Sequence, residues 1–307
     1  MEKALDLSGQ GLSALPASIE KLVALEELDL DRNELSSLPE WIGRLANLKS
    51  LSLYSNRLSS LPESVWRLTK LQTLNLAENR FTSLPEGIGH LTDLRMLDVG
   101  HNELNLLPSS LGNLKGLAFL YASNNKLADA PDSLARLSGL LYLNLTDNSL
   151  ASLPESFGSL AALIELRLYN NRISALPEAL GQLSKLRELH LMNNELTTLP
   201  SSTGGMTSLR KLDLQDNRLT SLPESLGNLK SLTDLNLRNN SLAQLPQSIG
   251  QLKSLRYLDL RANRNVRLPE SLGELTRLEK LDLRWTKLSP LPGWLRRLEQ
   301  RGCIVFT

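Results

Sequence analysis

The hydrophobic residues of this chain follow a pattern that recurs every 23 residues. In residues 25–47, Leu28 and Leu30 alternate with acidic residues, and this period of two predicts a short strand with one buried face. Further leucines follow the strand, and residues 40–45 are expected to form a single helical or 3₁₀ turn. Each repeat therefore predicts one strand and one turn on the opposite side.

Asparagine and proline keep the same period. Thirteen prolines run from Pro16 to Pro292, and eleven asparagines run from Asn33 to Asn263, both in steps of 23 residues. Proline lacks an N–H and therefore ends strand pairing before the turn. Each asparagine lies at a bend where its amide can both donate to and accept from buried backbone groups. We interpret these asparagines as structural, and expect the loss of one to cost about 1–3 kcal/mol.

Nine of the thirteen repeats carry glycine where the turn ends, as at Gly43. This position is expected to have a left-handed or crowded backbone. Self-similarity at a fixed period predicts a stacked repeat protein, because a one-sided unit cannot bury its leucines alone. We therefore expect one solenoid over 1–307 with about 13 repeats, including an N-terminal edge repeat at 1–24 and a C-terminal cap at 287–307. Either N-terminal capping is minimal or the chain has been trimmed.

The spacing LxxLxLxxNxLxxLPxxIGxLxx resembles the leucine-rich repeat over nearly the whole chain. Its LPxxIG variant is similar to the repeats of Ras-associated scaffold proteins, plant Ras-group proteins and some bacterial effectors injected into host cells. The resemblance implies an α/β horseshoe solenoid, with a concave parallel β-sheet and short helical or 3₁₀ turns on the convex side. We call the exposed side of this sheet the strand face.

Residues six, four, two and one positions before each asparagine belong to the strand face, and they vary between repeats while the leucines do not. They give an acidic start (Glu27, Asp29 and Asp31), an aromatic centre (Met96, Phe119, Tyr121, Tyr142, Tyr169 and Met192) and a basic column near the C-terminal end (Arg238, Arg261 and Arg284). The candidate partner-binding residues are Tyr54, Met96, Phe119, Tyr121, Tyr142, Arg167, Tyr169, His190, Met192, Arg238, Tyr257, Arg261 and Arg284.

Two interpretations stay open for these side chains. Tyrosine is enriched at binding hot spots, but it is also favoured in strands for packing alone. The basic column is either an anion-binding patch or an ion-pair ladder, since Asp259 and Asp282 each lie two residues from an arginine. Trp285 either extends the contact surface or packs under the C-terminal cap.

Composition narrows the class of protein. The net charge of +1 does not suggest nucleic acid or a membrane surface as a partner, although residues 1–150 carry −5 and residues 151–307 carry +6. Cys303 is the single cysteine, which excludes an intramolecular disulfide and favours a reducing compartment. The first residues lack the apolar segment of a secretory signal, and no apolar run is long enough to span a bilayer. We expect a cytoplasmic monomer, or delivery into a host cell if it is an effector.

No catalytic motif, phosphate loop or dinucleotide-binding pattern is found in the sequence. His101 and His190 lie four repeats apart, about 19 Å at ordinary strand spacing, which is too far for one metal ion. Cys303 has no histidine near it in the repeat register. We therefore expect no enzyme activity, no cofactor and no metal.

The sequence favours a non-catalytic protein–protein interaction module that binds a protein partner on the concave face, as scaffold and signalling proteins do. An alternative is the substrate-recruiting part of an effector-type ubiquitin ligase whose catalytic domain is absent from this chain. A purely structural repeat array without a partner is a third possibility.

Overall fold

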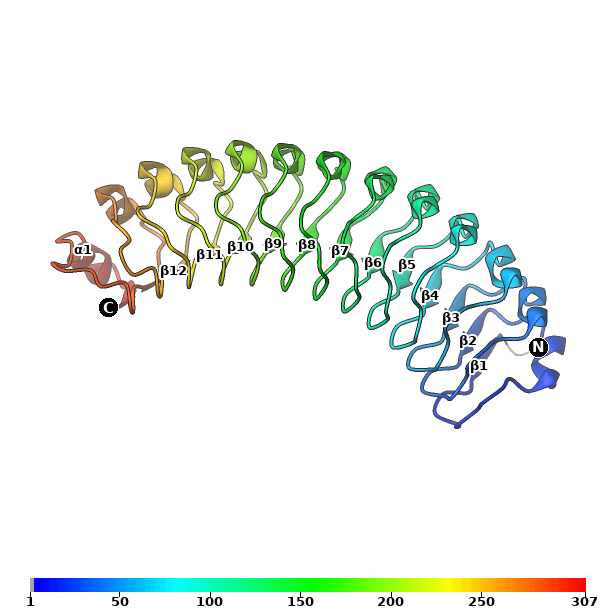
Figure 1. The fold of residues 1–307 in the computed structure, drawn as a ribbon. Coiled ribbons are helices and arrows are strands. Elements are labelled where there is room, and N and C mark those ends of the chain that lie inside the picture. Colours follow the sequence, from blue (N-terminus) through cyan, green and yellow to red (C-terminus); the bar gives the residue numbers. More distant parts are fainter. Residues whose placement is uncertain (1–2) are drawn as a thin grey trace. The chain divides into compact units, whose positions relative to one another are not determined.

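The computed structural model describes residues 3–307. They form two compact units, here called unit 1 (3–148) and unit 2 (149–307). Each unit contains seven parallel strands in chain order, and a 3₁₀ turn follows nearly every strand (Figure 1).

The strands and turns of unit 1 alternate regularly. Its strands are β1 (Ala4–Asp6), β2 (Glu27–Asp29), β3 (Ser50–Ser52), β4 (Thr73–Asn75), β5 (Met96–Asp98), β6 (Phe119–Tyr121) and β7 (Tyr142–Asn144). Its turns are η1 (Ala17–Lys21), η2 (Glu40–Arg44), η3 (Glu63–Arg67), η4 (Glu86–His90), η5 (Ser109–Asn113) and η6 (Asp132–Arg136).

Unit 2 continues the alternation and ends differently. Its strands are β8 (Glu165–Arg167), β9 (Glu188–His190), β10 (Lys211–Asp213), β11 (Asp234–Asn236), β12 (Tyr257–Asp259), β13 (Lys280–Asp282) and β14 (Ile304–Phe306). Its turns are η7 (Glu155–Ser159), η8 (Glu178–Gln182), η9 (Ser201–Gly205), η10 (Glu224–Asn228), η11 (Gln247–Gln251) and η12 (Glu270–Glu274), followed by helix α1 (Leu295–Gln300).

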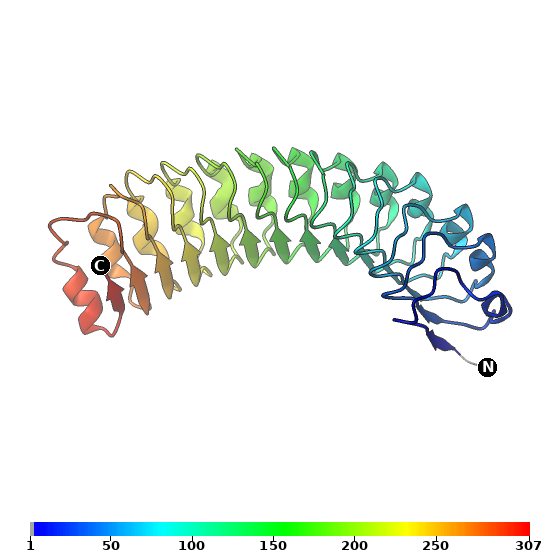
Figure 2. The same cartoon turned by 60° about the horizontal axis from the view of Figure 1, so that its bottom comes forward.

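Strand pairing follows the repeat length. Ala4 pairs with Glu27 in unit 1 and Glu165 pairs with Glu188 in unit 2, both 23 residues apart. In each unit the strands lie side by side as arrows, with the turns on the other side (Figure 2). The predicted α/β repeat architecture, with a parallel sheet and 3₁₀ turns, is therefore confirmed in each unit.

The leucines form the core between the strands and the turns. On β2, Leu28 is 1% exposed, and Leu30 and Leu35 are fully buried. Ile42 of η2 closes the same layer from the turn side. Because side chains alternate along a strand, the residues between these leucines are directed to the strand face.

The eleven periodic asparagines bind buried backbone groups, as predicted. The Asn102 amide donates to the carbonyls of Leu76, Val99 and Gly100 at 3.0–3.2 Å, and its Oδ1 accepts the Phe81 N–H at 3.0 Å. Every asparagine of this series accepts a backbone N–H at Oδ1 in the same way. An apolar residue here would leave the backbone N–H unpaired and remove one of the two donors that each carbonyl accepts from.

The residue before each asparagine adopts a left-handed conformation that the sequence analysis did not anticipate. Its φ is +54° at Arg32, +53° at Glu78 and +60° at Ala262, and Gly9 and Trp285 have this conformation in the two repeats where the asparagine is replaced. The bend therefore depends on two adjacent positions. The asparagine forms hydrogen bonds with the backbone groups, and the residue before it changes the chain direction at some conformational cost.

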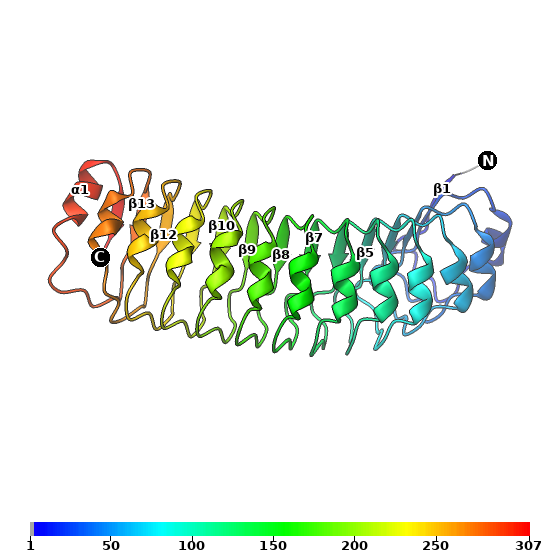
Figure 3. The same ribbon diagram turned by 90° about the horizontal axis from the view of Figure 1, so that it is seen from above.

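The glycines that end the turns serve close packing. Gly43 does not have a positive φ, and a Cβ built there would lie 2.6 Å from the Ser64 side chain of the next turn. The crowded backbone was thus the correct alternative. Figure 3 shows the turns of each unit stacked in chain order.

Residues 287–307 have their own structure. Helix α1 buries Leu295 and Leu298, and Trp294 packs against Gly273 of η12. Strand β14 then pairs with β13 in a register one residue longer than elsewhere, with Lys280 opposite Ile304. Across residues 3–307, the helices are all too short to cross a bilayer.

Candidate functional site

The strand face presents different side chains in the two units. Positions six and four residues before the asparagine lie on the strands, and the position two residues before lies just beyond each strand end. Of the thirteen predicted site residues, twelve are partly or fully exposed, and His190 is buried. Their role in binding stays a prediction.

Four apolar side chains gather over β5, β6 and β7 in unit 1, and we call them the aromatic patch: Met96, Phe119, Tyr121 and Tyr142. Strand register places Phe119 between Met96 and Tyr142. The rings of Tyr121 and Tyr142 lie 4.9 Å apart at a tilt of 39°. Phe119 is 40% exposed, whereas phenylalanine side chains are most often buried. The patch thus offers apolar area beside two rings that hold each other in place.

Two other tyrosines are held by charged neighbours. The Tyr54 hydroxyl donates to Glu78 at 2.8 Å, and the Tyr257 hydroxyl donates to Glu279 at 3.0 Å. The Arg256 guanidinium also lies 5.4 Å from the centre of the Tyr257 ring. Tyr169 lies in unit 2, half-buried like Met192 of the following repeat. The predicted aromatic centre is therefore divided between the units.

Two arginines of the basic column are bound to carboxylates. Arg261 contacts Asp259 at 2.5 Å, and Arg284 contacts Asp282 at 2.6 Å. Burial acts to raise the pKa of Asp282, but hydrogen bonds and charge from Arg284 outweigh it and lower this pKa. Both arginines thus form the ion pairs expected of a ladder, and their role in partner binding stays a prediction.

Arg238 differs from them. Asn236 occupies the strand position that Asp259 and Asp282 take in later repeats, and within residues 3–307 no carboxylate lies within ion-pair distance of the Arg238 guanidinium. Arg238 is therefore the arginine of the column whose charge is not balanced by such a pair. Trp285 is 63% exposed with Arg284 beside its ring, so it does not pack under the C-terminal segment.

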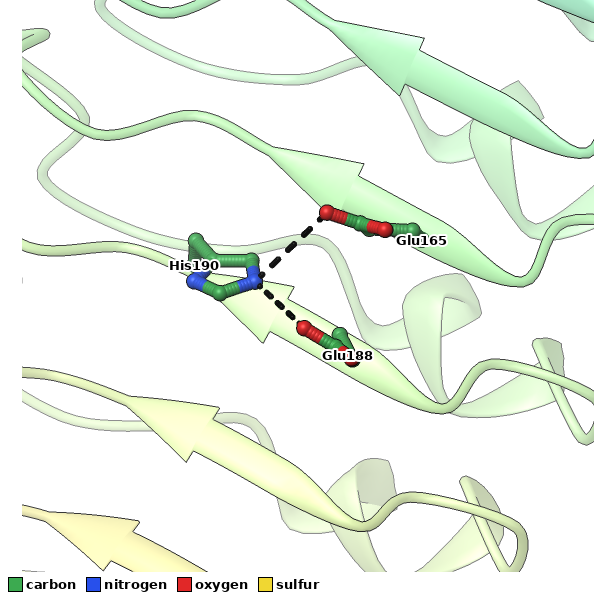
Figure 4. A group of neighbouring side chains, drawn as sticks. All are labelled: Glu165, Glu188 and His190. Carbon is green, nitrogen blue, oxygen red and sulfur yellow. Dashed lines mark hydrogen bonds and ion pairs between the residues drawn. The ribbon is translucent and has the colours of Figure 1, made fainter.

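A second arrangement lies on β8 and β9, where Glu165, Glu188 and His190 converge. Nε2 of His190 lies 3.0 Å from Glu188 Oε2 and 3.8 Å from Glu165 Oε1. Figure 4 shows the imidazole facing both carboxylates, with Glu165 on β8 and Glu188 on β9. One donor atom from each residue lies within 4.8 Å of the others. We call this group the histidine–glutamate cluster.

Charged neighbours surround this cluster. Arg167 Nε lies 2.5 Å from Glu165 Oε1, and Lys211 of β10 pairs in register with Glu188. Burial lowers the pKa of His190 below its ordinary value, and the Glu188 hydrogen bond opposes this effect. Burial raises the pKa of Asp213, which lies beside His190 on the next strand.

From sequence, His190 was expected only as a partner-binding residue. The spacing of the histidines from one another argued against a metal site, but their spacing from carboxylates also matters. The signal was present, because Glu165 and Glu188 occupy the same position in consecutive repeats and His190 lies two residues after Glu188. Register alone would have placed all three side chains on one face.

Cys303 is buried. The side chain is 4% exposed, and burial raises the pKa of its thiol to about 11. The thiol form is a poorer nucleophile than the thiolate.

Comparisons with known families identify the repeat. The model described as "Leucine-rich repeat region" matches residues 60–140, 130–217 and 208–300, and the model "Leucine rich repeat" matches residues 3–58. Together they cover nearly the whole chain. No curated protein sequence matches it.

Solved structures show the same fold. A leucine-rich repeat protein of Leptospira interrogans is 32% identical, with 99% of this chain and 95% of that chain covered and a TM-score of 0.63. An internalin of Listeria monocytogenes is 24% identical, covering 99% and 86% of the two chains, with a TM-score of 0.81.

A plant membrane receptor kinase ectodomain, GASSHO1/SCHENGEN3 from Arabidopsis thaliana, was solved in complex with CASPARIAN STRIP INTEGRITY FACTOR 2. It is 32% identical with a TM-score of 0.70, and the match covers 96% of this chain but 39% of the receptor chain. The periodic asparagines, the parallel strands and the family models agree, and the chain belongs to the leucine-rich repeat family.

Proposed function

We propose that this chain is a non-catalytic protein-interaction module whose partner contacts the strand face. The aromatic patch of unit 1 carries the proposal, because it combines an exposed Phe119 with the paired rings of Tyr121 and Tyr142. Binding hot spots are enriched in aromatic residues that are already held in place, since little side-chain entropy is then lost on binding.

The relatives support this class of function. The plant receptor ectodomain described above was solved with a bound factor, and another similar structure is a plant peptide hormone receptor, RGFR1, in complex with RGF2. The chain spans about half or less of those receptor chains, so their signalling activity is not transferred to it. We extend to this chain only the use of a repeat surface to bind a protein or peptide.

The partner is expected to present an apolar side chain to Phe119. We expect the Arg238 guanidinium, in unit 2, to bind an anionic group of the same partner or of another one. In contrast, Arg261 and Arg284 contribute little, because their charges are already balanced by Asp259 and Asp282.

Site-specific photo-crosslinking tests the proposal directly. A benzophenone amino acid replaces Phe119 in one variant and Leu106 in the other, and crosslinked partners are identified by mass spectrometry. Leu106 is a matched control because it is 58% exposed in the same unit but lies outside the strand positions. We expect a specific adduct from position 119 and none from position 106. Equal labelling from both positions, or a specific adduct from 106 alone, would exclude the aromatic patch.

A further inference from the structure

We infer that Glu165, Glu188 and His190 form a binding site for a divalent transition-metal ion of the Zn²⁺ class. The inference does not depend on the proposed partner surface. It rests on three potential ligands from two adjacent strands whose donor atoms lie within 4.8 Å of one another.

The backbone fixes the arrangement of these ligands. Strands β8 and β9 are paired in parallel, with Glu165 opposite Glu188 and Arg167 opposite His190. The His190 side chain is 8% exposed, so its ring has little freedom to turn away from the carboxylates. The histidine–glutamate cluster is thus partly organised for binding before an ion arrives.

The distances suit a small ion after modest adjustment. Donor atoms around tetrahedral zinc lie about 3.3 Å apart, given bonds of about 2.0–2.1 Å. The His190–Glu188 distance of 3.0 Å already matches, and the His190–Glu165 distance of 3.8 Å needs a small shift of a flexible carboxylate. Without an ion, Nε2–H donates to Glu188; an incoming ion displaces this proton, so that the neutral ring keeps its proton on Nδ1 and directs the Nε2 lone pair at the ion.

The chemistry of the ligands selects the class of metal. Calcium and magnesium prefer sites made of oxygen atoms alone, whereas imidazole favours zinc, copper, nickel and cobalt. The Glu165 and Glu188 side chains are 21% and 42% exposed, so an ion can enter from solvent. Three protein ligands leave at least one coordination position for water.

Two cations compete with the metal. Arg167 binds the Glu165 oxygen that would serve as ligand, and Lys211 lies opposite Glu188 on the next strand. Asp213 and the two glutamates oppose these positive charges. Removing the Arg167 charge should therefore tighten metal binding. If Glu165 served only in a structural ion pair with Arg167, the loss of that charge would not change the affinity for metal.

Isothermal titration calorimetry of the whole chain with Zn²⁺ tests the inference. We expect one ion per chain, at least tenfold weaker binding in His190→Gln and Glu188→Gln, and tighter binding in Arg167→Met. His101→Ala and Glu195→Gln are matched controls, because they remove an exposed histidine and a paired carboxylate elsewhere and should not change the affinity. Circular dichroism checks that each variant is folded.

A second measurement keeps the inference testable if zinc also binds elsewhere. Co²⁺ replaces Zn²⁺, and the histidine ring protons are followed by NMR. Paramagnetic shifts of the His190 ring, absent for His101, would support the site. Zinc binding that is unchanged in both His190→Gln and Glu188→Gln, or no binding by the unmodified chain, overturns it.

Discussion

The two sides of the sheet differ in how far their residues vary between repeats. On β6, Leu120 is fully buried while its neighbour Phe119 is 40% exposed, although both residues are large and apolar. Toward the interior, nearly every repeat carries the same leucines and the same asparagine. On the strand face, consecutive repeats carry aromatic, acidic, basic or small residues.

The difference separates the residues that determine the fold from those that are free to determine recognition. The interior fixes the fold by repetition, since each repeat must match the previous one at Leu, Asn, Pro and Gly positions. The strand face has no such requirement, so its residues can change without changing the backbone. Recognition in this protein is therefore expected to be separable from stability, and the following predictions test that separation.

The largest difference is expected between the two neighbours on β6. Leu120→Ala should lower the free energy of unfolding by about 2–5 kcal/mol, because it leaves a cavity between packed layers. Phe119→Ala should change it by less than about 1 kcal/mol, since the ring is already partly in water. Urea unfolding followed by circular dichroism measures both values. Equal losses would mean that Phe119 belongs to the core.

The second prediction concerns the buried amides. Asn102→Ala should cost about 1–3 kcal/mol, because the Phe81 N–H loses its acceptor and three carbonyls each lose one of two donors in a site that is 9% exposed. The exposed Asn105 lies three residues away, and Asn105→Ala should stay within about 0.5 kcal/mol. The same urea experiment compares them, and a harmless Asn102→Ala would contradict the structural role of this series.

A third prediction concerns a turn that departs from the repeat. Trp66 takes the position where most repeats have glycine, and the following turn has Gly87 where most others have serine. A Cβ at Gly87 would lie 2.8 Å from the Trp66 ring, so Gly87→Ser should destabilise by about 1–3 kcal/mol.

In a Trp66→Gly background the same Gly87→Ser change should be neutral or stabilising, because it restores the pair found in other turns. A double-mutant cycle measures this coupling. Additive effects would show that the two positions do not compensate each other.

The smallest effect is expected at Asp98 of the strand face. Burial raises the pKa of this carboxyl above its ordinary 3.8, so its ionised form is less favourable in the folded chain than in the unfolded chain. Its contribution to stability is therefore lost as pH rises through the folded-state pKa. Asp98→Asn keeps the oxygen that accepts the Gly100 N–H. The variant should be slightly more stable at pH 7, with the advantage disappearing below about pH 4. A pH series of urea midpoints checks this.

Much of the fold could be predicted from sequence because it depends on periodic positions. Leu28, Leu30 and Asn33 each recur in register, so one repeat determines the interpretation of the others. The left-handed residue before each asparagine was missed because its identity changes from Arg32 to Glu78 to Ala262. Only the frequent Asn and Asp at that position signalled it, since these residues tolerate this conformation better than others.

The candidate sites were less predictable, because they depend on contacts between non-repeating side chains. The sequence placed Arg238, Arg261 and Arg284 in one column but left open which of them are paired. That depended on the Asp259 and Asp282 carboxylates, and only coordinates give those distances. Similarly, the burial of His190 results from its neighbours on β8 and β10, which the repeat pattern does not specify.

The separation of recognition from stability is tested most directly with one triple variant, in which Phe119, Tyr121 and Tyr142 are replaced by alanine. Partner binding and the urea midpoint are measured on the same preparation. We expect a loss of affinity of at least about 30-fold, as for hot-spot residues, with a folded chain whose stability falls by no more than about 2 kcal/mol. Unchanged affinity in a folded variant, or unfolding caused by these three changes, would contradict it.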